Sequence, residues 1–271
     1  MQKCDNNSLT SDREPFEPAK TQEGRERTFL AAPAKPVFRT RFHDTLRTSS
    51  LSTMDAEPKA LSSAMLLAAT GGLLDAVVFL NHGHVFANNM TGNLIFLGIA
   101  VVAHNVDSVI LHIVPICAFF LGVLTSKYLR TGLGMRCAPI ALVLEIVTIF
   151  ALGLLSPGAP SMMFTGVIAY VAAVQVASFR HVEAFAYNST FMTGNLRDVA
   201  EGLYEDLAPS SKPETRSQGR AKTIDLGLMV LCFLLGAVVG AWAAPRFGNH
   251  SLWLAEPLLI AVAVPVFRHR S

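Results

Sequence analysis

The chain has 271 residues, of which 51% are hydrophobic and only 15% are charged, and its formal net charge is +2. Soluble domains carry about 25% charged residues, so this composition excludes a soluble globular domain as the main structure. No basic stripe accompanies the small positive charge, and we expect no nucleic-acid partner. The four cysteines, Cys4, Cys117, Cys137 and Cys232, show no CxxC spacing, so we expect neither a disulfide framework nor a metal site.

The beginning of the chain differs in kind from the rest. Residues 1–55 are rich in Ser, Thr, Arg, Glu and Pro and lack apolar periodicity, so we predict a disordered polar extension. No apolar run lies near its start, which excludes a signal peptide there, and its acidic residues argue against a transit peptide. Met54 is an alternative translation start. If translation begins there, the upstream extension is a mis-assigned part of the sequence. Residues 56–157 and 158–271 are predicted to form two membrane repeats.

Six apolar runs are long enough to cross a bilayer, which requires about 20 mostly apolar residues and tolerates about 17. Two shorter segments, Leu94–Ala103 and Leu196–Leu207, are not expected to cross. The first is apolar but short, which suits a re-entrant or half-length helix. The second carries five charged residues and one apolar helical stripe, which suits a helix in the membrane interface or against the bundle. The six predicted spans are Leu61–Leu80, Ser108–Ser126, Pro139–Leu155, Met162–Phe179, Leu226–Ala244 and Ser251–Phe267.

The positions of the basic residues favour this topology. If the chain enters the first span from the cytoplasm, twelve Lys and Arg residues beyond the extension lie on the cytoplasmic side, and only Arg246 lies outside. Basic residues concentrate on the cytoplasmic side of membrane proteins. We therefore predict a multi-pass protein of the cell inner membrane with both termini in the cytoplasm. The twelve residues are Lys59, Lys127, Arg130, Arg136, Arg180, Arg197, Lys212, Arg216, Arg220, Lys222, Arg268 and Arg270.

An internal repeat is the most informative pattern in the sequence. The Met-Thr-Gly-Asn element at Met90–Asn93 recurs at Met192–Asn195, 102 residues later. In each half, a span precedes the element and a short helix follows it. Each unit holds three spans, an odd number, so the second unit enters the membrane from the opposite side. The predicted fold is an all-α membrane protein with six transmembrane helices in two inverted three-helix repeats, each with one extra short re-entrant or interfacial helix. Further matches in the same order are Phe119–Gly122 with Phe233–Gly236, and Glu145 with Glu256.

Two stretches resemble a known family. The run Gly71–Ala76, followed by Val85–Asn93, is similar to the first signature of the YoaK-like family of bacterial integral membrane proteins. Gln175, Arg180 and Thr193–Asn195 resemble that family's second signature. The resemblance covers roughly residues 60–268 and implies a multi-span inner-membrane protein. It implies no activity, because the family is one of unknown function.

The two Met-Thr-Gly-Asn elements are candidate solute-binding segments. Asn and Thr cap helices well, and Gly lets another group approach the backbone closely. Before a short helix, such residues would direct free N–H groups and a positive dipole end toward an anion. Alternatively, each element is only a cap and a packing joint. The candidate binding residues are Asn89, Thr91, Gly92, Asn93, Thr193, Gly194 and Asn195, together with Gln175 and Arg180.

Three acidic residues within the predicted spans are candidates for proton or ion coupling, because acids inside a membrane are costly and usually face the bundle interior. Asp75 lies one turn after Gly71–Gly72, and its alternative role is a hydrogen-bonded structural acid. Glu145 has apolar residues on both sides. Glu256 precedes Pro257, as in the first turn of a helix, where a carboxylate also complements the helix dipole.

Other polar residues favour structural interpretations. Arg180 could bind an anion or pair with Glu183, although such an arginine more often only marks the cytoplasmic end of a span. His82 and His84 flank Gly83 and are expected to be ordinary loop residues rather than metal ligands. Small residues of the fifth predicted span, including Gly227, Gly236 and Gly240, suit close helix packing.

Two functions follow as alternatives. The first is a secondary transporter or permease for an unidentified small solute, with proton coupling as an option. The second is a membrane scaffold or assembly factor that docks a partner on Ala208–Thr223, expected to be a cytoplasmic loop. No nucleophile elbow, HExxH, phosphate loop or CxxC occurs, so we expect no enzymatic activity and no cofactor. The lipid bilayer is the expected environment, and homo-oligomerisation stays open.

Overall fold

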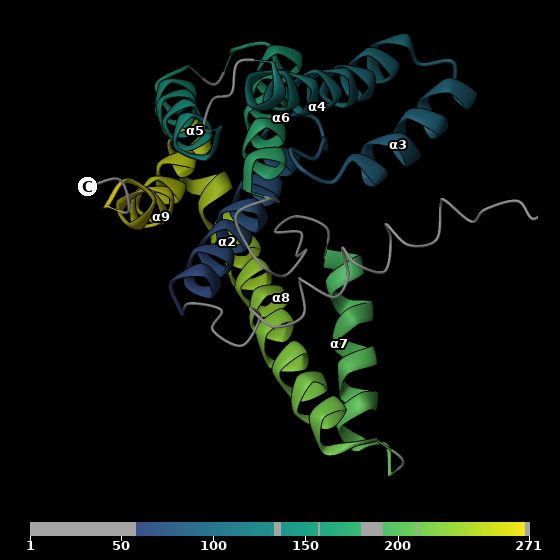
Figure 1. Cartoon of the computed structure of the whole chain (residues 1–271). Helices are drawn as coiled ribbons and strands as arrows, with labels where there is room; N and C mark the ends of the chain where they lie inside the picture. Colours follow the sequence, from purple (N-terminus) through teal and green to yellow (C-terminus); the bar gives the residue numbers. More distant parts are fainter. Residues whose placement is uncertain (1–57, 133–136, 157, 180–191, 210, 269–271) are drawn as a thin grey trace, which may run out of the picture. The chain divides into compact units, whose positions relative to one another are not determined.

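A computed structural model of the chain describes residues 58–132, 137–156, 158–179, 192–209 and 211–268 (Figure 1). The predicted extension, Arg180, His181 and Glu183 lie outside these residues. Every regular element within the described ranges is a helix, and these residues belong to one compact unit. The helices are α2 Pro58–Asn81, α3 Met90–Val102, α4 Val106–Thr131, α5 Cys137–Gly153, α6 Ser161–Phe179, α7 Met192–Leu207, α8 Pro213–Phe247, the 3-10 helix η1 Gly248–Ala255, and α9 Glu256–Arg268.

Four stretches of the described chain are long and apolar enough to cross a membrane. They are Leu61–Asn81, Val106–Thr131, Ser161–Phe179 and Pro213–Phe267, the last of which runs through α8, η1 and α9. The apolar helices α3 and α5 are shorter, with 13 and 17 residues. An all-helical protein with several apolar helices is therefore confirmed.

Several helix boundaries differ from those predicted. Helix α3 begins at Met90 and α7 at Met192, so each Met-Thr-Gly-Asn element forms the first turn of its helix rather than the segment before it. Helix α8 begins at Pro213, which corrects the expectation of a loop over Ala208–Thr223. Proline is well accommodated in the first helical turn, because its missing N–H would have no partner there. The last predicted span divides into η1 and α9, and α9 begins at Glu256, as the Glu-Pro pair indicated.

Helices α2 and α8 pack closely along parallel paths. A Cβ atom on Gly236 would overlap the backbone carbonyl of Ala69, and one on Gly240 would lie 2.6 Å from the carbonyl oxygen of Leu73. Residue numbers increase together along both helices at these contacts, so α2 and α8 run in the same direction. Small residues allow this approach, because backbone meets backbone without an intervening side chain. The predicted packing role of Gly236 and Gly240 is confirmed, whereas Gly227 has no atom within 4 Å of its Cβ position.

Helices α4 and α6 form a second parallel pair of the same kind. A Cβ atom on Gly122 would lie 2.5 Å from the carbonyl oxygen of Tyr170. Further along both helices, the hydroxyl groups of Ser126 and Ser178 are 3.1 Å apart and buried. Ser178 also donates to its own helix, at the carbonyl of Val174. The two parallel pairs each join one helix from residues 56–157 with one from residues 158–271.

The helix ends gather in two groups. In the first, the side chain of Asn249, after α8, contacts both His82, after α2, and the carbonyl of Leu155, after α5. His82 also stacks on Phe164 near the start of α6. In the second group, the Cys137 thiol at the start of α5 donates to the Ser126 carbonyl of α4, beside Ser178 near the end of α6. Helices α2, α5 and α8 therefore end where α6 begins, and α4 and α6 end where α5 begins.

Helix α7 lies along the N-terminal part of α8 (Figure 1). A Cβ atom on Gly202 of α7 would lie 2.7 Å from the carbonyl oxygen of Gly219 on α8. The Lys222 ammonium of α8 pairs with Glu201 at 3.3 Å and with Asp198 at 3.8 Å on α7. Glycine contact and ion pairs hold the polar faces together, which leaves Leu196, Leu203, Tyr204 and Leu207 exposed on α7.

Candidate functional site

The first candidate segment begins with a loop that folds back onto Asp75. Asp75 is 6% exposed, and its carboxylate accepts the backbone N–H of Asn88 at 2.7 Å. The Asn88 side chain in turn donates to the carbonyl of Gly71 at 3.4 Å. Asp75 and Asn88 thus fasten the loop after α2 to the Gly pair of the same helix. This is the arrangement expected of a structural acid, and it also holds the start of α3 in place.

Asn89 is the cap of α3. Its side-chain oxygen accepts the N–H of Gly92 at 3.1 Å, which satisfies one of the free N–H groups of the first turn. The N–H of Asn93 and that of Met90 donate to the carbonyls of Asn89 and Asn88. A Cβ atom on Gly92 would lie 2.7 Å from the Phe86 ring, so glycine is required there for packing. The donors needed for an anion site at this helix start are therefore largely occupied.

Asn93 makes the strongest link between α3 and the preceding loop. Its side-chain oxygen accepts the N–H of Phe86 at 2.9 Å, and its side-chain nitrogen donates to the carbonyl of Phe86 at 2.8 Å. The residue is fully buried. An asparagine amide can satisfy both backbone groups of one residue, because it carries a donor and an acceptor side by side. In this copy, Thr91 is exposed, whereas Asn93 is committed to the protein backbone.

The second copy preserves part of this arrangement. The Asn195 side-chain nitrogen lies 3.8 Å from the Met192 sulfur, and in the first copy the Asn93 nitrogen lies 3.7 Å from the Met90 sulfur. Asn195 is buried, and Thr193 is exposed. Met192 packs on a cluster that includes Ala64 and Met229, toward the starts of the α2 and α8 membrane segments. The first copy lies instead near the end of α2, so the two elements occupy opposite ends of that helix.

The two matched glutamates lie on α5 and α9, two helices that pack on each other. Glu145 is 1% exposed, and Glu256 lies in the first turn of α9. One oxygen of each carboxyl group, Oε2 of Glu145 and Oε1 of Glu256, is buried without a hydrogen-bond partner. The helices pack on each other around Leu142, Ile149 and Leu259, which belong to the main apolar core.

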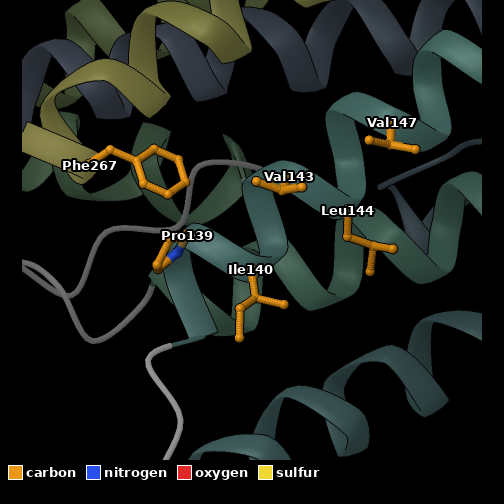
Figure 2. A pocket seen from close by; sticks show the side chains of 6 residues that line it. All are labelled: Pro139, Ile140, Val143, Leu144, Val147 and Phe267. Atoms are coloured by element: carbon orange, nitrogen blue, oxygen red, sulfur yellow. The ribbon is translucent and has the colours of Figure 1, made fainter.

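The remaining candidates lie apart from these groups. Gln175 is buried on α6, one turn before Ser178, and Arg180 lies outside the described residues. An apolar hollow of about 450 Å³ lies between α5 and the end of α9 (Figure 2). The six side chains drawn in Figure 2 are Pro139, Ile140, Val143, Leu144, Val147 and Phe267, none of which carries a charge. A second hollow, on α7, is lined by Arg197, Ala200, Glu201, Tyr204 and Glu205. No candidate binding residue lines either hollow.

His82 was predicted to be an ordinary loop residue, and this prediction is wrong. The His82 side chain is 2% exposed and its ring stacks on Phe164. Its Nε2 atom lies 3.0 Å from the side-chain oxygen of Asn249. Because the Asn249 nitrogen donates to the Leu155 carbonyl, its oxygen accepts a hydrogen bond from the Nε2–H group of His82. Neither residue belongs to a repeat signature, and only the structure brings them together. His84 is exposed and has a positive φ of 59°.

The stability of the protein is expected to fall in acid through His82. Burial lowers the pKa of this imidazole, although its hydrogen bond with Asn249 acts in the opposite direction. The unfolded chain therefore binds a proton more readily than the folded protein, and stability decreases as the pH falls below the unfolded value of about 6.5. Thermal unfolding in detergent, followed from about pH 8 to about pH 5, should show a weaker pH dependence for His82→Gln than for the wild type. Identical slopes would contradict this role.

Two residues of the site were not identified from the sequence. Asn88 joins Asp75 to Gly71, and its signal was the Asn-Asn pair before the first element, which is typical of a turn. Asn249 joins three helix ends, and nothing in its local sequence distinguishes it from a surface loop residue.

Comparison with known proteins agrees with the apolar helices. Residues 63–265 match a family described as "Protein of unknown function (DUF1275)". The chain is also similar to the UPF0700 transmembrane protein YoaK of Bacillus subtilis (strain 168), with 24% identity over 204 residues, which are 73% of this chain and 89% of that protein. No solved structure matches the chain. The resemblance read from the two signatures is therefore confirmed, and the chain is a multi-pass membrane protein.

Proposed function

We propose that this chain, which belongs to the family described as "Protein of unknown function (DUF1275)", is a secondary transporter or permease that moves a small solute and is coupled to protons. The observation that carries the proposal is the reciprocal pairing of helices between the two halves. Inverted repeats, in which helices of one half pack against helices of the other half, are the architecture of many secondary transporters. Architecture alone does not fix function, so a transport measurement has to decide.

Matched residues support the inverted repeat. Gly122 contacts Tyr170, and its sequence match Gly236 contacts Ala69. Ala69 and Tyr170 are 101 residues apart, close to the 102 residues between the two Met-Thr-Gly-Asn elements. The contact between α2 and α8 therefore corresponds to the contact between α6 and α4. A two-fold relation between the halves produces this reciprocity, whereas two independent bundles would pair helices within each half.

Six crossings with both termini in the cytoplasm fit the two groups of helix ends. Helices α2, α5 and α8 finish in the group around Asn249, and α6 starts there. Helices α4 and α6 finish in the group around Ser126, and α5 starts there. Consecutive membrane helices thus alternate in direction. With the basic residues on the cytoplasmic side, the Asn249 group faces outward across the cell inner membrane.

The residues proposed to carry coupling are the buried acids Asp75 and Glu145 and the half-buried Glu256, one oxygen of which is shielded from solvent. Asp75 accepts the backbone N–H of Asn88, whereas each glutamate has an oxygen without a partner among the described residues, which makes the glutamates the stronger candidates. The proposed solute contacts are the exposed Thr91 and Thr193 and the remaining signature residues. Because no catalytic motif accompanies these groups in the sequence, we place transport above enzymatic activity.

A proton-flux measurement tests the proposal. Purified protein is reconstituted in liposomes that contain a pH-sensitive dye, and a panel of small anions, cations and neutral metabolites is added in turn. We expect one class to produce proton movement above that of empty liposomes, and Glu145→Gln to reduce its initial rate at least about tenfold, as loss of a coupling group does in a proton relay. Asp107→Asn is the matched control, because this acid is exposed in the first turn of α4. Folded wild-type protein that moves no solute would refute the proposal.

A membrane scaffold is the second candidate. It is favoured by the exposed apolar residues of α7, of which Leu207 is 69% exposed and Tyr204 72% exposed beside polar α8 residues. Affinity capture in mild detergent discriminates the two functions. A stoichiometric partner that is lost after replacement of Leu203, Tyr204 and Leu207 by serine, together with no flux, would favour the scaffold.

A further inference from the structure

We infer that Glu145 and Glu256 form a single acidic site, at the contact between α5 and α9, that binds one exchangeable proton shared by the two carboxyl groups. The two acids come from matched places in the two halves of the chain. Leu142 and Ile149, about one turn on either side of Glu145, share an apolar core with Leu259, one turn after Glu256. The packing of the flanking residues places both acids on the same side of their helices, toward the core.

The site has two oxygens that lack partners. Oε2 of Glu145 and Oε1 of Glu256 are both shielded from solvent and accept no hydrogen bond from the described residues. Glu145 is 1% exposed as a whole. A buried carboxylate oxygen without a donor is unfavourable, and two like charges on neighbouring helices add repulsion to this cost. Some ligand that supplies a positive charge or a donor is therefore required at this place.

No basic side chain within the described ranges forms an ion pair with either acid. Helix α6, which packs on α5, contains no Asp, Glu, Lys or Arg. The other titratable residues of the elements packed on α5 and α9 have contacts elsewhere, lie toward helix ends or, in the case of Cys117, are exposed. They are Asp75, bonded to Asn88; Tyr170, 3.1 Å from Thr125; His112, stacked on Phe96; His250, against Trp253; and Asp107, Cys117, Lys127, Tyr128, Arg130, Cys137 and Arg268.

A proton suits this donor set better than a metal ion. Mg²⁺ and Ca²⁺ take about six or more oxygen ligands, and the described residues contain no group of three or more His, Cys, Asp or Glu placed to hold a metal. One proton converts one carboxylate to a carboxylic acid, whose O–H is a hydrogen-bond donor. The doubly charged pair becomes singly charged, which removes the repulsion between two like charges.

The inference deepens the proposed function, because it names where the coupled proton binds, but proton binding itself does not require transport. In a transporter built from inverted repeats, the binding site opens in turn to each side of the membrane. A site made from one residue of each half lies between the halves, where it can be reached from either side.

Infrared pH-difference spectroscopy tests the shared proton. Purified full-length protein in lipid nanodiscs is titrated in H2O and D2O, and the carboxylic-acid carbonyl band is followed. Glu145→Gln and Glu256→Gln should each move the midpoint of the remaining acid to lower pH by at least about one unit, because removal of one like-charged neighbour favours ionisation of the other. The double variant should lose the band, and Asp107→Asn should leave it unchanged.

Two results would overturn the shared site: a midpoint that is unchanged in either single variant, or bands that the two variants remove independently. If a glutamine variant does not fold, Glu145→Asp and Glu256→Asp retain the carboxyl group but move it away from its partner by one methylene, and each should still shift the midpoint of its partner to lower pH. If the midpoint shifts in the variants but the wild-type protein moves no solute, the shared proton site stands and the transport proposal is rejected.

Discussion

Gly236→Leu is expected to force α2 away from α8 and to lower the melting temperature of the protein in detergent. The Cβ position of Gly236 overlaps the carbonyl carbon and oxygen of Ala69, which are backbone atoms and cannot rotate away. Overpacking a core with extra carbons costs about 1–3 kcal/mol where side chains can adjust. An overlap with backbone atoms should cost at least the upper end of this range. The corresponding fall in the melting temperature is about 10 °C for a chain of this size. Fluorescence-detected size exclusion and thermal unfolding measure both effects.

Gly227→Leu is the matched control on the same helix. No atom lies within 4 Å of its Cβ position, so the added side chain meets open space and the melting temperature should change by less than about 2 °C. Gly122→Leu, at the matched place in the pair of α4 and α6, is expected to destabilise the protein as Gly236→Leu does. Equal behaviour of the Gly227 and Gly236 variants would show that close approach at Gly236 does not limit packing.

Asn93→Ala is expected to release the loop between α2 and α3. The substitution removes the acceptor for the Phe86 N–H and the donor to the Phe86 carbonyl. Each partly buried group left without a partner costs about 1–3 kcal/mol, so the loss of both places the total at about 2–6 kcal/mol. Limited proteolysis should then cut the loop at His84, which is already exposed, far faster than in the wild type.

Thr91→Ala provides the control for this loop. Thr91 is exposed in the same helical turn, and surface substitutions of this kind change stability by less than about 0.5 kcal/mol. If Thr91→Ala abolishes solute flux while stability is unchanged, the residue contacts solute. If Asn93→Ala leaves proteolysis unchanged, the two hydrogen bonds to Phe86 do not hold the loop.

The sequence alone determined the membrane class, the positions of most helices, the family and the recurrence of the Met-Thr-Gly-Asn element. Apolar runs of about 20 residues have few structural solutions other than a membrane helix, because each backbone group is satisfied within its own segment. The capping signals were read nearly correctly, but the cap of α3 is Asn89 and the Met-Thr-Gly-Asn element is the first turn. The difference is local: Asn93 has a better partner in the loop backbone than it would have as a cap.

Only the tertiary structure decided which distant residues meet. Hydrophobic periodicity shows which residues avoid water, but every face of a membrane helix is apolar, so it does not identify the neighbour of that helix. The pairing of α2 with α8, the packing of α5 on α9 and the burial of His82 against Asn249 all join residues more than 100 positions apart in the chain. These contacts depend on how the two halves interlock, and short-range patterns carry no information about that arrangement.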